Sequence, residues 1–71
     1  MTTRTAIYVQ TQHQATAEVV ERVAQVSPDE AESWAEVAMI GPDATVREYT
    51  TDSFEAAVDQ LVEQGFVRIA S

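Results

Sequence analysis

The 71-residue sequence contains no cysteine, which excludes disulfide bonds and the thiolate ligands of the commonest structural zinc sites. It also contains no lysine, so four arginines face twelve Asp and Glu residues and the formal net charge is −8. A surface that binds nucleic acid needs clustered Lys and Arg, and we therefore expect no direct binding to DNA or RNA. No apolar run approaches the roughly 20 residues that cross a bilayer, so we expect a cytoplasmic protein.

Signals for catalysis are also missing. His13 is the only histidine, and no carboxylate lies within four residues of it. The sequence has no glycine-rich phosphate loop, no metal-spaced cluster and no nucleophile motif. We therefore expect a non-enzymatic protein without a metal ion or cofactor.

The length allows one domain, residues 1–71, with a single small core. A chain of this size hides only about 60% of the surface that its unfolded form exposes, so self-association, for example as a homodimer, would stabilise it. The lysine-free, acidic composition, rich in valine and alanine, resembles that of proteins from high-salt environments.

Residues 27–41, SPDEAESWAEVAMIG, carry the signals of a helix. Ser27 would be the N-cap, Pro28 the first helical residue and Glu30 the partner of the cap, while Gly41-Pro42 would end the helix. An apolar stripe then follows at helical spacing, with Trp34 as its largest member: Ala31, Trp34, Ala35 and Ala38.

A second helix is predicted after Asp52-Ser53, again from a capping pattern, and Gly65 would end it. Its apolar stripe consists of Phe54, Ala57, Val58, Leu61 and Val62.

Residues 5–11, 45–50 and 66–70 alternate in the manner of strands. Residues 15–26, ATAEVVERVAQV, fit either a helix or a strand; their β-branched density favours a strand. The predicted fold is therefore α+β in the order β-β-α-β-α-β, with a three- to four-stranded sheet and two helices on one face.

Strand alternation in that fold places three of the four arginines and three of the five aromatic residues on the sheet face without helices: Arg4, Tyr8, Arg47, Tyr49, Phe66 and Arg68. On the same parity, Val67 and Ile69 point at the helices. Arginine and tyrosine are enriched in protein interfaces, so Tyr8, Arg47, Tyr49, Phe66 and Arg68 are the candidate partner-binding residues. In the alternative interpretation, the three aromatic rings complete a small core and arginine stems cover them.

The two predicted helices would turn an acidic face to solvent, with carboxylates about 6 Å apart: Glu32, Glu36, Glu55, Asp59 and Glu63. Such a face is either simply solvated or resembles the phosphates of a nucleic-acid strand.

These observations favour a small protein–protein interaction module that binds itself or a larger protein through the Arg/aromatic sheet face. One alternative is an acidic nucleic-acid mimic that inhibits a DNA- or RNA-binding enzyme. Another is a regulatory domain that binds a small ligand between protomers.

Overall fold

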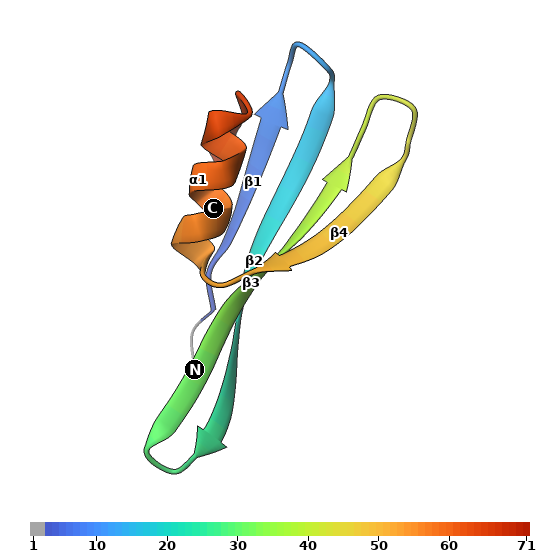
Figure 1. Ribbon diagram of the computed structural model, residues 1–71. Coiled ribbons are helices and arrows are strands. Elements are labelled where there is room, and N and C mark those ends of the chain that lie inside the picture. Colours follow the sequence, from blue (N-terminus) through green and yellow to red (C-terminus); the bar gives the residue numbers. More distant parts are fainter. Residues whose placement is uncertain (1–2) are drawn as a thin grey trace.

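The computed structural model describes residues 3–71 as a five-stranded antiparallel sheet with one helix packed against it (Figure 1). The elements in chain order are β1 (Thr5–Gln10), β2 (Ala15–Ser27), β3 (Glu30–Ile40), β4 (Val46–Thr51), α1 (Phe54–Glu63) and β5 (Val67–Ala70). The strands lie in the order β4-β3-β2-β1-β5. Among residues 3–71, no helix is long and apolar enough to cross a membrane.

The predicted α+β fold with two helices is wrong, because residues 30–40 form strand β3 and no helix begins at Ser27. Pro28 and Asp29 instead form the tight turn that joins β2 to β3, and Ser27 pairs with Glu30 across it. Serine followed by proline suits the first two positions of a β-turn as well as it suits a helix start. Residues 27–30 therefore form the turn of the β2–β3 hairpin.

Pairing with β2 explains why an alanine- and glutamate-rich segment is extended. The two strands pair from Thr16–Ile40 to Ser27–Glu30, so β3 has a partner strand along its whole length. Ala35 and Val37 alternate into the core, and Met39 packs against it. Tertiary pairing and burial here override the modest helix preference of Ala and Glu.

Two other predictions are confirmed. Residues 15–26 belong to a strand, β2. The second predicted helix is α1, where the Ser53 hydroxyl caps the N-terminus by accepting a hydrogen bond of 3.1 Å from the Ala56 backbone N–H. Gly65 follows the helix with φ of 88°, a left-handed conformation that glycine adopts without a steric penalty.

The core lies between α1 and one face of the sheet. Phe54, Ala57 and Leu61 are the buried residues of the helix, and the helix packs against β2, β3 and β4. The sheet and the residue preceding β5 supply the other buried side chains: Ala6, Tyr8, Ala17, Val19, Ala35, Val37 and Phe66. The opposite face of the sheet has no covering element among the described residues.

The β2–β3 hairpin extends beyond the body of the sheet as an arm (Figure 1). β1 pairs only with residues 15–20 of β2, and β4 pairs only with residues 35–40 of β3, so residues 21–34 form a two-stranded ribbon, here called the arm. The radius of gyration is 13.2 Å, against about 11 Å for a compact chain of this length. The accessible surface is 4901 Å², roughly 500 Å² more than a compact 7.8 kDa monomer exposes.

Candidate protein-binding surface

The predicted Arg/aromatic set does share one face of the sheet, but this face is the one that α1 covers. Tyr8 is 2% exposed and Phe66 is 4% exposed, so both belong to the core. Tyr49 is half-buried and packs against that core, whereas Arg47 and Arg68 lie exposed at its margin. The alternative interpretation, in which these rings complete the core, therefore describes the structure, and this set does not form an open surface.

The helix covers the opposite face of the sheet from the one predicted from the sequence. Ala6 and Tyr8 of β1 face the helix, so Ile7 and Val9, which alternate with them, face away from it. In β5, Val67 and Ile69 were expected to point at helices, but they are 65% and 60% exposed.

The face opposite α1 is here called the open face, and apolar side chains dominate it. Cross-strand pairing assigns one row of neighbours from Val67 through Val9, Thr16 and Ile40 to Val46, across all five strands. The apolar residues of the open face are Ile7, Val9, Val20, Trp34, Ala38, Ile40, Val46, Val67 and Ile69. Its charged residues are Glu18, Arg22, Glu32, Glu36 and Glu48.

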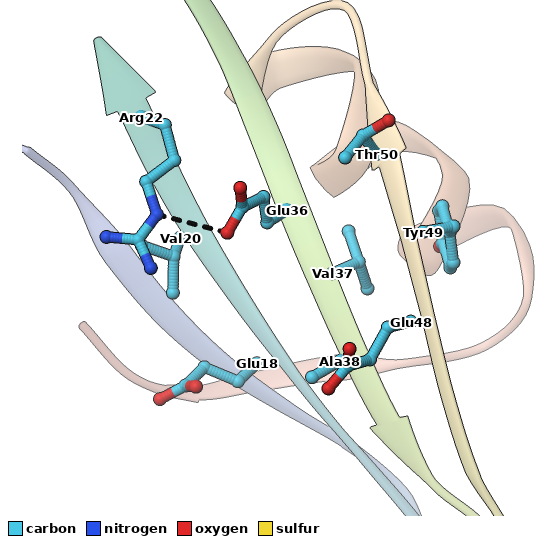
Figure 2. Close-up of a pocket in the computed structure, with 9 residues that line it drawn as sticks. All are labelled: Glu18, Val20, Arg22, Glu36, Val37, Ala38, Glu48, Tyr49 and Thr50. Carbon is cyan, nitrogen blue, oxygen red and sulfur yellow. Dashed lines mark hydrogen bonds and ion pairs between the residues drawn. The ribbon is translucent and has the colours of Figure 1, made fainter.

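A groove of about 450 Å³ lies on the open face over β2, β3 and β4. Figure 2 shows its lining: Glu18, Val20, Arg22, Glu36, Val37, Ala38, Glu48, Tyr49 and Thr50. The groove is shallow and open to solvent, and it combines aliphatic side chains with three carboxylates and one guanidinium.

One carboxylate of the groove is already neutralised within the chain. The Arg22 Nε atom donates to Glu36 Oε1 at 3.0 Å (Figure 2), and the Trp34 indole N–H donates to Glu36 Oε2 at 3.2 Å. These two donors, Arg22 first, hold the pKa of Glu36 below its ordinary value. By contrast, no basic side chain of residues 3–71 forms an ion pair with Glu18 or Glu48.

Trp34 is the residue whose position differs most from the sequence-based expectation. It does not fill the core from a helix; it lies half-buried where the arm joins the body, directly across from Arg22. The alternation of Ala35, Val37 and Met39 with Trp34, Glu36 and Ala38 is the sequence signal that assigns Trp34 to the opposite face of a strand.

The predicted acidic face does not exist as one surface. Glu32 and Glu36 project from β3 on the open face, whereas Glu55, Asp59 and Glu63 lie exposed on α1, on the other side of the sheet. Glu55 is also paired with the Arg4 guanidinium at 2.6 Å.

Arg4, which directly precedes β1, contacts β2 and α1 on the side of the sheet that α1 covers. Its Nη2 atom lies 2.7 Å from Glu21 Oε2 in β2, and the guanidinium stacks over the Phe54 ring of α1 at 4.4 Å from the ring centroid. Arg4 thereby holds the pKa of Glu21 below its ordinary value of 4.5, chiefly through the side-chain hydrogen bond.

Replacing this arginine gives a pH-dependent prediction. A carboxylate with a lowered pKa stabilises the folded state above its ordinary pKa, and this stabilisation is lost as the pH falls through the lowered value. Arg4→Gln is therefore expected to lower the melting temperature at pH 7, and the difference from the wild type should shrink as the pH falls below 4.5. Circular dichroism melts across this pH range measure both effects.

The matched control is Arg68→Gln, because the only side-chain hydrogen bond of the Arg68 guanidinium among residues 3–71 goes to the neutral Ser71 hydroxyl, at 2.8 Å. Its melting temperature should follow that of the wild type at every pH. A pH-independent loss of stability in Arg4→Gln would contradict the ion-pair explanation and would assign the effect to the contact with Phe54.

Within residues 3–71, no group of three or more His, Cys, Asp or Glu side chains is arranged to hold a metal ion. No protein-family model, no curated protein and no solved structure matches the chain.

Proposed function

We propose that the chain is a non-enzymatic protein–protein interaction module whose contact surface is the open face of the sheet. One observation carries this proposal: four large aliphatic side chains on this face, Ile40, Val46, Val67 and Ile69, are each at least 50% exposed. When one face of an antiparallel sheet is exposed to solvent, the side chains on that face are ordinarily polar. Several exposed aliphatic side chains on one face of a small protein are typical of a binding surface.

The shape of the molecule supports the same proposal. The arm carries its own part of the open face, with Arg22 and Trp34 at its base, away from the helix that stabilises the body. A two-stranded ribbon on its own is only marginally stable in water. A partner bound along the body and the arm would bury part of the extra accessible surface that the arm exposes and would stabilise the two-stranded ribbon.

The acidic-mimic alternative needs a continuous array of carboxylates. Because the structure separates Glu32 and Glu36 from Glu55, Asp59 and Glu63, no observation favours it over protein binding.

A charge placed in the apolar row tests the proposal. In Ile40→Glu/Val46→Glu, two exposed aliphatic side chains become carboxylates, which cost little in water but several kcal/mol when buried unpaired in an interface. Tagged protein carrying this double substitution should lose the capture of a partner from the native lysate, and any self-association through the open face, while keeping its circular dichroism spectrum.

The control is Val62→Glu, because Val62 is 58% exposed on α1, away from the open face. It should bind as the wild type does, at about 0.1 M and at about 1 M salt, since an apolar contact survives screening. Binding that survives in the double variant and disappears in Val62→Glu would overturn the proposal.

A further inference from the structure

We propose that the open face receives a basic amphipathic helix of another protein, three to four turns long. This inference rests on the proposed function and specifies the partner. Three observations support it: apolar side chains follow one another along the strands, glutamates pair with the residue at the centre of this series, and the chain itself is strongly acidic.

An apolar column runs along the centre of the open face, nearly parallel to the strands. It consists of Trp34, Ala38 and Ile40 of β3 together with Val20 of β2, which pairs with Glu36. From Trp34 to Ile40 the strand rises about 20 Å, at about 3.3 Å per residue. A helix of about 13 residues has the same length.

The partner element is a helix because it lies on a face and not on an edge. An extended segment joins a sheet through free backbone groups, which only the edge strands offer. Apart from Trp34, which lies at the base of the arm, the column belongs to the inner strands β2 and β3, whose backbones pair with neighbours on both sides over residues 15–20 and 35–40. Such a face contacts a partner through side chains, as a helix packed on a sheet does.

The charge of that helix follows from the register. Ala38 pairs with Glu18 on one side and with Glu48 on the other, so the centre of the column lies between the strand positions of two glutamates. Adjacent strands are about 4.8 Å apart, which places the two carboxylates under the flanks of a helix whose apolar stripe rests on Ala38. Neither carboxylate has a basic partner within residues 3–71, so Lys or Arg at the helix flanks would complete both pairs.

A second copy of this chain fits the face poorly. Two open faces in contact would bring together Glu18 and Glu48 of both copies, and Arg22 is already paired with Glu36 at 3.0 Å. The helix of a second copy is also unsuitable, because the exposed side of α1 carries Glu55, Asp59 and Glu63. Like charges at an interface oppose association, so the partner is a different, basic protein.

Three synthetic helical peptides of about 18 residues test this inference. They share one leucine stripe and carry Lys, Gln or Glu at the flanking positions. Trp34 is the only tryptophan of the chain and lies in the column, so its fluorescence reports occupancy of the open face. The Lys peptide should bind at least about ten-fold more tightly than the Gln peptide, and the Glu peptide should not bind.

Two double variants identify the carboxylates responsible. In Glu18→Gln/Glu48→Gln, the preference for Lys over Gln should fall to less than about three-fold. In Asp59→Gln/Glu63→Gln, which removes the same charge from the exposed side of α1, the preference should stay near its wild-type value.

Equal affinity for the Lys and Gln peptides would overturn the inference, as would a preference that survives Glu18→Gln/Glu48→Gln. If no peptide binds while the wild type self-associates or captures a protein through Ile40 and Val46, the basic-helix inference is wrong and the proposed function stands. If Ile40→Glu/Val46→Glu leaves every interaction intact, the proposed function fails as well.

Discussion

Leu61→Ala is expected to lower the free energy of unfolding by about 2–5 kcal/mol, whereas Val62→Ala, one residue later on α1, should change it by less than about 0.5 kcal/mol. Leu61 is fully buried between the helix and the sheet, and Val62 is 58% exposed. Because small domains are stable by only about 5–15 kcal/mol, the first substitution removes a large share of the total. Urea denaturation followed by circular dichroism at 222 nm measures both values.

The comparison within one helix turn tests burial, because alanine has the highest helix propensity and neither substitution therefore destabilises the protein through propensity. Equal destabilisation by the two variants would show that the helix packs on another side, and the assignment of the covered and open faces would then fail.

Val37→Lys is expected to unfold the protein, and Ala38→Lys is expected to leave it folded. Val37 is 1% exposed beneath α1, where an unpaired ammonium costs several kcal/mol. Ala38 lies on the open face between Glu18 and Glu48, so a lysine there gains two oppositely charged neighbours. Far-ultraviolet circular dichroism at room temperature distinguishes the two outcomes.

This pair of variants also separates the strand from the helix that residues 27–41 resemble. On a helix, Ala38 would share the buried stripe with Trp34 and Ala35, and Val37 would lie outside it. An unfolded Ala38→Lys together with a folded Val37→Lys would therefore contradict strand β3.

Local sequence signals predicted α1 well because they are redundant. The Ser53 cap, the stripe from Phe54 to Leu61 and the glycine at position 65 all indicate the same element, and the structure contains each of them. The strand over residues 15–26 was favoured for its β-branched residues, and it forms because both of its neighbours pair with it.

The Ser27-Pro28 signal failed because it is not specific. A helix start and a β-turn both favour serine followed by proline, and only the long-range pairing of β2 with β3 distinguishes them. The segment also contains two competing patterns: an alanine stripe with one tryptophan at helical spacing, and the alternation of Ala35, Val37 and Met39 at strand spacing.

The candidate site was predicted on the wrong face of the sheet for a separate reason. Strand alternation correctly grouped Tyr8, Tyr49 and Phe66 on one face, because the period of a strand is fixed by its backbone. Which of the two faces is covered is a tertiary property, and the alternation does not contain it. The burial of Tyr8 and Phe66 leaves Ile40, Val46, Val67 and Ile69 on the open face.

Methyl nuclear magnetic resonance tests the central claim most directly, namely that the open face is the binding surface. With isoleucine, leucine and valine methyl groups labelled, the Lys peptide should shift the signals of Val20 and Ile40. The signals of Leu61 and Val62, which belong to α1, should stay in place. Shifts confined to the methyl groups of α1, with Val20 and Ile40 unchanged, would contradict the account.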